Sequence, residues 1–258
     1  AVYLNGPRQV YGKQTAIFAE LSLTCMDSHR VTVATDARWQ WYLGQHREAE
    51  FYHGERIDRT AVPTAPQPVV LAEDLNAHAP ALVPQQCEPV RVLERRTPVQ
   101  LLHTPDGTPI LDFGQNMAQE GDRGLLTVRL DWQGSPGQEI TLRFAEALTP
   151  DGSLYTANLR TAKATDTFVC SGGKDTFVPR FTYHGFRYVL IDGAVPAGEP
   201  NPEGLPEIVD VRCLLDYPTD GDRINNDRQQ TSQSVDFKYP MGTTFQLPFG
   251  SYRLSAAR

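Results

Sequence analysis

The feature that most constrains the fold is a run of alternating side chains between residues 181 and 191. Its large apolar residues fall first on odd numbers, at Phe181 and Tyr183. They then fall on even numbers, at Phe186, Tyr188 and Leu190. A period of two is typical of a strand with one face on a core, so we expect a central strand here. Because the inward parity switches between the sets, we expect a β-bulge at His184 and Gly185, with Gly185 at positive φ.

Other alternating runs are separated by turn residues along the chain. Residues 17–23 and 31–33 flank a polar turn, and residues 126–130 and 140–144 flank a Gly-Ser-Pro-Gly turn. Each pair predicts two strands that run antiparallel across the turn, with one polar face. We therefore expect an all-β chain of two antiparallel, jelly-roll-like β-sandwich units.

Proline content divides the chain. Between residues 61 and 90 there are six prolines and little periodicity, which indicates an extended linker over residues 63–88. The linker joins a smaller β-sandwich unit over residues 1–62 to a larger one over residues 89–215. The polar residues 216–258, with three prolines, are expected to form an irregular tail.

Composition excludes two classes of partner. A net charge of −7 and a pI near 5.4 disfavour nucleic acid, which is bound through clustered Lys and Arg. The mean hydropathy is −0.40, and no apolar run approaches the roughly 20 residues that span a bilayer, so we expect a soluble chain without a membrane partner. The chain begins at Ala1 without a leader, which suggests a processed chain or a fragment and leaves cytoplasmic and secreted locations both open.

The cysteines give no metal-type signature. Cys25, Cys87, Cys170 and Cys213 are far apart in sequence, so we expect buried free thiols and assign no metal ligands.

Two aromatic segments in the first unit have alternative interpretations. Trp39 and Trp41 are suited either to stacking on a sugar or to burial in a core. In the acidic segment 48–59, Glu55 and Asp58 are suited to a carboxylate cluster around a sugar or a divalent cation. Alternatively, that segment is a solvated loop in which both carboxylates pair with its arginines.

The polar loop over residues 149–163 is a candidate for sugar binding. Its Tyr155, Asn158 and Arg160 combine a ring that stacks on a sugar with planar groups that hydrogen-bond to hydroxyls. Equally, Asn158 and Arg160 are suited to satisfying backbone groups of the loop itself.

Taken in order, several segments resemble the β-sandwich region of bacterial α-L-rhamnosidases. They are residues 112–116, 140–146, 151–160, 164–166 and 181–188, and the Tyr-x-Gly-Glu-x-x-Asp stretch at 52–58. The resemblance covers residues 16–215 and implies a partial amino-terminal domain followed by a concanavalin-like β-sandwich. It departs from the family after Asn116, where a charged segment replaces the family's Ala-Gly-Trp.

The resemblance also implies what the chain does. Family members are inverting glycoside hydrolases, which need an acid and a base carboxylate roughly 6.5–9.5 Å apart. In the family, these carboxylates lie on a helical domain that follows the β-sandwich region. Residues 222–228 of this chain do not match the motif of that domain, so no catalytic residue is assigned. The resemblance implies an accessory portion that supports a catalytic domain or chain, or that binds rhamnose-containing glycans.

Three points stay open at this stage. A glycoside hydrolase that acts on terminal α-L-rhamnose by itself would need carboxylates such as Glu146 and Asp151. A structural or partner-docking module would need no sugar. Calcium accompanies L-rhamnose in a module of such enzymes, but no residues here match its ligands.

The candidate residues for carbohydrate binding or a domain interface come from the strands and loops described above. They are Asp112, Asn116, Tyr155, Asn158, Arg160, Tyr183, His184 and Arg187. Because a buried Arg needs a paired charge, we expect at least two of Tyr183, His184 and Arg187 to reach the surface.

Overall fold

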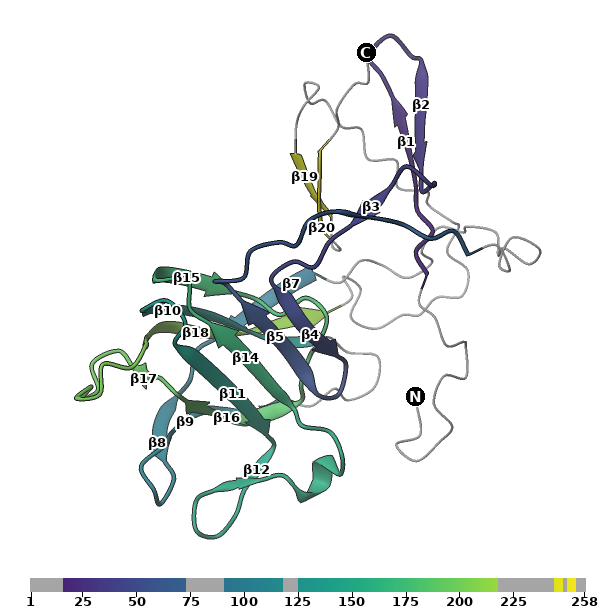
Figure 1. Ribbon diagram of the computed structural model, residues 1–258. Helices are drawn as coiled ribbons and strands as arrows, with labels where there is room; N and C mark the ends of the chain where they lie inside the picture. The colour runs from purple at the N-terminus through teal and green to yellow at the C-terminus, as the bar shows by residue number, and fades with distance from the viewer. Residues whose placement is uncertain (1–15, 73–90, 118–124, 218–243, 248–249, 254–258) are drawn as a thin grey trace, which may run out of the picture. The chain divides into compact units, whose positions relative to one another are not determined.

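A computed structural model describes residues 16–72, 91–117, 125–217, 244–247 and 250–253 (Figure 1). The chain divides into two compact units. The described part of the first contains residues 16–42, 66–72 and the two short C-terminal segments, and that of the second contains residues 43–65, 91–117 and 125–217. Apart from one 3-10 turn, every regular element in these ranges is a β-strand, so the expected all-β fold is confirmed. The described residues include no helix of the length and apolar character that crosses a bilayer.

The larger sheet of the second unit has seven strands. In spatial order they are β4 (His46–Glu50), β5 (Gly54–Asp58), β14 (Thr165–Val169), β11 (Glu139–Ala145), β16 (Phe186–Asp192), β9 (Pro109–Met117) and β8 (Gln100–His103). All neighbours are antiparallel except β5 and β14, which are parallel. The predicted strand, β16, therefore lies inside the sheet, between β11 and β9.

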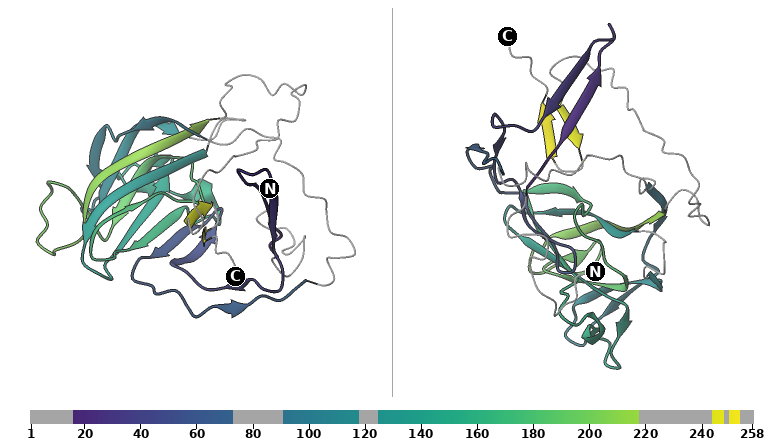
Figure 2. Two further views of the ribbon diagram at one scale, coloured as in Figure 1. Left: turned by 90° about the horizontal axis from the view of Figure 1, so that it is seen from above. Right: turned by 90° about the vertical axis from the view of Figure 1, so that its right-hand side faces the viewer.

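A second sheet of five strands packs against the first. It contains β15 (Gly173–Phe177), β10 (Leu125–Gly134), β18 (Glu207–Tyr217), β17 (Val195–Pro196) and β7 (Arg91–Arg96). Figures 1 and 2 show the two layers. Both sheets supply the core, in which Trp132 of β10 lies 5.5 Å from Phe168 of β14, between ring centroids. The second unit is thus a β-sandwich with one shared core.

One predicted pairing is wrong. The strands on either side of the Gly-Ser-Pro-Gly turn, β10 and β11, belong to opposite sheets and do not pair with each other. Inward residues of both strands, such as Leu130 and Leu142, meet in the core, so the turn carries the chain from one layer to the other. Alternation reports that a strand has a buried face, but it does not report the partner of that strand.

The described residues of the first unit form three separate strand pairs. They are β1 (Glu20–Thr24) with β2 (Arg30–Ala34), β3 (Gln40–Trp41) with β6 (Gln67–Pro68), and β19 (Thr244–Leu247) with β20 (Gly250–Arg253). The hairpin of β1 and β2 confirms the prediction for residues 17–33. The expected irregular tail is wrong in two places, because β18 continues to Tyr217 and β19 pairs antiparallel with β20.

The structural division differs from the expected boundary after residue 62. Residues 43–65 belong to the second unit, because β5 pairs with β14 inside the seven-stranded sheet. The amide of Glu55 also donates to Oδ1 of Asp166 at 2.9 Å. Most of the predicted linker, residues 73–88, lies outside the described residues.

A register irregularity lies close to the predicted β-bulge, but its extra residues are on β9 and not on β16. Phe186 pairs with Met117 and Tyr188 with Asp112, so residues 113–116 of β9 lie opposite the single residue Arg187. After it the buried residues are Val189 and Ile191, whereas Tyr188 and Leu190 are only half-buried. Gly185 is not among the glycines at positive φ, so the proposed conformation there is wrong. The inward parity switches at Arg187 because this side chain turns to a charged partner.

Candidate functional site

Most of the predicted site residues gather at one end of the seven-stranded sheet. There β9 and β11 end, and β16, β14 and β5 begin, because each strand is antiparallel to its neighbour except for the parallel pair of β5 and β14. We call this region the sheet end. Asp112 and Asn116 lie on β9, and Tyr183, His184 and Arg187 lie at the start of β16 and in the segment before it. Residues Tyr155, Asn158 and Arg160 follow β11, on β13 (Leu154–Tyr155) and around the 3-10 turn Ala157–Leu159.

Arg187 and Asp112 form a two-point ion pair. Nε and one terminal nitrogen of Arg187 donate to the two carboxylate oxygens of Asp112 at 2.8 and 2.9 Å. The amide of Gly114 donates to the same carboxylate at 2.7 Å. The hydrogen bonds from Arg187 lower the pKa of Asp112 and raise that of Arg187, because each favours the charged form of its partner. The planar donor that we expected to face a sugar is therefore already occupied.

His184 lies in the interior rather than on the surface. Its Nε2 is 3.2 Å from Oδ1 of Asp166, and both side chains are almost completely buried. The imidazole also stacks on Phe144, with ring centroids 4.5 Å apart. His184 is thus part of the packing between strands and not of a surface site, while Tyr183 and Arg187 are half-buried, as expected for two of the three.

Glu55 has a structural role that the sequence did not indicate. Its buried carboxylate accepts the amides of Arg180 and Phe181 at 2.8 and 2.9 Å, and its other oxygen lies 3.0 Å from Nε2 of His46. Neither predicted alternative is right for this residue, because it lines no solvated loop and pairs with neither neighbouring arginine. Its carboxylate instead fixes the segment that leads into β16.

The arginines beside Glu55 have other partners. Arg56 pairs with Glu139 at 2.7 Å, and Arg59 donates to Gln45 and to the carbonyl oxygen of Thr176. Asp58 accepts from the amide and hydroxyl of Thr60. The carboxylates of this segment therefore do not converge as a cation site would require.

The predicted loop residues are exposed, and one of them is paired. Nδ2 of Asn158 donates to Oε2 of Glu146 at 2.9 Å. Tyr155 is 43% exposed, and Asn116 and Arg160 are also exposed. Arg160 has φ 59°, which marks a tight reversal after the 3-10 turn. The loop therefore presents separate side chains and no assembled set of donors.

Exposed apolar side chains lie at both edges of the sheet end, in the turn between β4 and β5 and just before β8. Phe51 is 50% exposed, Tyr52 39% and Val99 70%. Phe51 packs edge-on against Tyr183, with centroids 4.6 Å apart, and burial of Tyr183 raises the pKa of its hydroxyl. Val99 donates its amide to the carbonyl oxygen of Asp112 at 2.8 Å. We call Phe51, Tyr52, Val99 and Tyr183 the apolar rim. No periodic pattern marks the first three in the sequence.

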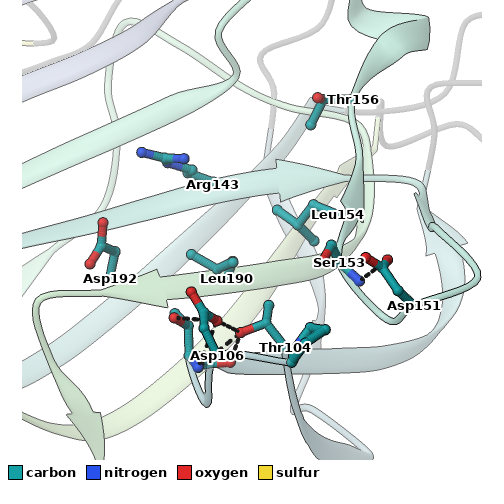
Figure 3. A pocket seen from close by; sticks show the side chains of 11 residues that line it. Thr104, Asp106, Arg143, Asp151, Ser153, Leu154, Thr156, Leu190 and Asp192 are labelled. Atoms are coloured by element: carbon teal, nitrogen blue, oxygen red, sulfur yellow. Dashed lines mark hydrogen bonds between the residues drawn. The ribbon is translucent and has the colours of Figure 1, made fainter.

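A groove of about 590 Å³ lies near the tips of two turns (Figure 3). Its lining includes Asp106 and Asp151, which occupy turns of nearly identical sequence, Thr-Pro-Asp-Gly-Thr and Thr-Pro-Asp-Gly-Ser. In each turn the Asp accepts from the preceding Thr hydroxyl, which lowers the pKa of the carboxyl group. Arg143 and Asp192 also line the groove, from β11 and β16, and among the described residues neither side chain has a hydrogen-bond or ion-pair partner.

Comparison with known proteins matches two domain families to this chain. Residues 2–94 match the α-L-rhamnosidase N-terminal domain, and residues 102–209 match the bacterial α-L-rhamnosidase concanavalin-like domain. An α-L-rhamnosidase of Streptomyces avermitilis is 37% identical over 203 residues, which are 74% of this chain and 19% of the relative. One from Alteromonas sp. is 34% identical over 193 residues, 71% of this chain and 20% of the relative.

The structural comparison agrees with these matches. The crystal structure of the Streptomyces avermitilis α-L-rhamnosidase complexed with L-rhamnose superposes with a TM-score of 0.67 at 34% identity. The superposition covers 84% of this chain and 20% of that protein. The chain thus spans about a fifth of the length of the curated relatives that it matches.

Proposed function

Because this chain is an α-L-rhamnosidase-related region with the amino-terminal and concanavalin-like domains of that family, we propose that it is an accessory region that supports a catalytic domain. The occupant of its docking surface is the remaining part of an α-L-rhamnosidase, since the match covers only about a fifth of the relatives. The surface is the sheet end with its apolar rim.

The single observation that carries this proposal is the internal pairing of the predicted sugar-binding side chains. Arg187 is bound to Asp112, His184 contacts Asp166 and Asn158 donates to Glu146. A sugar site needs convergent polar groups that are free to bind hydroxyls. Here the polar groups rigidify the sheet end instead, and the exposed side chains beside them are aromatic or aliphatic. Aromatic residues are enriched at protein interfaces, which supports docking.

A self-sufficient glycosidase has less support. A general acid for glycoside hydrolysis needs a raised pKa at its carboxyl group. The Thr149 hydroxyl holds the pKa of Asp151 below its usual value, and Glu146 accepts a hydrogen bond from Asn158. Asp151 therefore lacks the environment of a general acid, and the Glu146 carboxylate is already bound by a side chain of the protein.

Three versions of the Streptomyces avermitilis enzyme test the accessory role: the intact enzyme, one without the matched segment, and one in which this chain replaces it. We expect the deletion to lower the melting temperature and the hydrolysis of an aryl α-L-rhamnoside, and the replacement to restore both. Phe51→Asp and Val99→Asp in the replacement should abolish the recovery of melting temperature and of hydrolysis. Each isolated variant chain should melt at the same temperature as the unaltered chain. A deletion as active and heat-stable as the intact enzyme, or a replacement no better than the deletion, contradicts the proposal.

The groove supports a second candidate function, the binding of a rhamnose-containing glycan. Its volume is within the range of about 300–1,000 Å³ of small-ligand sites, and the side chains of Arg143 and Asp192 are free to bind hydroxyls. Calorimetric titration of the chain with L-rhamnose, with and without calcium, tests this function. Saturable heat that Arg143→Ala abolishes and the control Arg129→Ala retains supports it, and absence of heat in the unaltered chain excludes it.

A further inference from the structure

The turn between β1 and β2 brings three metal-binding side chains together. The turn is closed by hydrogen bonds from the Cys25 amide to the His29 carbonyl oxygen at 2.8 Å and from the Ser28 amide to the Cys25 carbonyl oxygen at 2.9 Å. Ser28 has φ 69°, the left-handed conformation that lets the chain reverse within these residues. Cys25 and His29 therefore face each other at the base of the turn, with Asp27 between them.

The donor atoms of these residues are close to one another. The Cys25 sulfur, a carboxylate oxygen of Asp27 and an imidazole nitrogen of His29 all lie within 4.8 Å of one another. Nδ1 of His29 is 2.5 Å from Oδ1 of Asp27, and this contact lowers the pKa of the Asp27 carboxyl group. Side chains of His29 and Asp27 are 59% and 70% exposed, and Cys25 is half-buried. A cation from solvent can thus reach an ionised carboxylate, a thiol and an imidazole at once.

We propose that the β1–β2 turn binds Zn²⁺ through the Cys25 thiolate, the His29 imidazole and the Asp27 carboxylate. Sulfur, nitrogen and oxygen donors in one site match the preference of zinc for four-coordinate sites with such ligands, and water completes the fourth position. Calcium and magnesium are disfavoured, because these hard cations take oxygen ligands and a thiolate is soft.

The geometry needs two small adjustments: the donor atoms that are up to 4.8 Å apart must approach, and the 2.5 Å contact between Nδ1 of His29 and Oδ1 of Asp27 must open. Tetrahedral zinc with bonds of about 2.0–2.3 Å places its ligand atoms about 3.4–3.7 Å apart. Rotation of exposed side chains on a short turn accommodates the difference from 4.8 Å without moving β1 or β2.

Titration of the reduced, tag-free full chain tests the proposal. Zn²⁺ is measured by competition with a chromophoric chelator, and Co²⁺ is used as a spectroscopic substitute. We expect one equivalent of Zn²⁺ to bind and Co²⁺ to give a thiolate-to-cobalt charge-transfer band. Cys25→Ser and His29→Asn should each weaken Zn²⁺ binding at least about tenfold. Cys25→Ser should also remove the thiolate-to-cobalt band.

The controls separate this turn from other thiols and imidazoles. His103→Asn removes an exposed histidine of the second unit and should leave the affinity unchanged. Cys170 and Cys213 are buried and remain in every variant. The proposal is overturned if the unaltered chain binds no equivalent of zinc, or if Cys25→Ser keeps both the affinity and the cobalt band. Circular dichroism of each variant confirms that the fold is retained.

Discussion

The Glu55 carboxylate accepts the backbone amide of Phe181 at 2.9 Å, although the two residues are 126 positions apart in the chain. The same oxygen accepts the amide of Arg180. Through this contact the start of β5 determines the path of the segment that enters β16. The arrangement of the sheet end therefore depends on a buried charge that contacts no ligand.

Replacement of Glu55 by Gln should release this segment. The amide oxygen is a weaker acceptor than a carboxylate, and hydrogen bonds to charged groups contribute about 1.5–3 kcal/mol. We expect faster hydrogen exchange at the amides of Arg180 and Phe181 and a lower melting temperature. Glu139→Gln is the matched control, since it removes an exposed pair with Arg56 that contributes little. Unchanged exchange at both amides would show that Glu55 does not hold the segment.

The ion pair of Asp112 with Arg187 should make stability depend on pH in the acid range. The hydrogen bonds from Arg187 hold the pKa of Asp112 below its ordinary value in the folded state, so the contribution of the pair is present above the unfolded pKa and is lost as the pH falls through the folded pKa. A double-mutant cycle with Asp112→Asn and Arg187→Ala should give a coupling of about 1–2 kcal/mol near neutral pH, less than for a fully buried pair, because the Arg187 side chain is 35% exposed. The coupling should shrink below about pH 4. A coupling independent of pH would contradict this assignment.

Gly54 should tolerate no side chain. A Cβ atom there would lie 1.8 Å from the carbonyl oxygen of Thr165, and the backbone has φ 120°. Gly54→Ala should therefore separate β5 from β14 and cost at least about 3 kcal/mol. Gly44→Ala is the control, because nothing lies within 4 Å of its added Cβ. Equal melting temperatures for the two variants would show that β5 does not pair with β14 as described.

The purified 258-residue chain should not hydrolyse an aryl α-L-rhamnoside. The pKa of Asp151 is lowered, which is opposite to what a general acid needs, and Glu146 accepts a hydrogen bond from Asn158. The measurement is release of the aryl group compared with buffer alone. Release above that rate, removed by Glu146→Gln, would assign catalysis to this chain.

Local pattern was sufficient for part of the fold. The β1–β2 hairpin and the strand nature of β16 follow from alternation over a few residues, which is a property of the strand itself. The position of the register irregularity does not, because its extra residues lie on β9, the neighbouring strand of the folded sheet. Likewise the sheet to which β10 belongs is set by β15 and β18, and not by the strand that follows it.

Several residues of the candidate site were predicted, but the hydrogen-bond partners of their side chains were not. The sequence identified Asp112, Asn158 and Arg187 as polar residues of one region, and the structure brings Asp112 and Arg187 together. It did not reveal that these groups bind protein partners, since the second partner of each pair is defined only by folding. Phe51 and Val99 were missed because single exposed apolar residues carry no periodic signal.

Hydrogen exchange at the apolar rim tests the accessory role most directly. The amides of residues 51–53 and 99–100 are compared between the isolated chain and the chain inserted in the Streptomyces avermitilis enzyme. If the sheet end seats the catalytic domain, exchange at these amides slows in the enzyme, and Phe51→Asp removes the effect. Exchange that is equally fast in both settings would contradict the proposal.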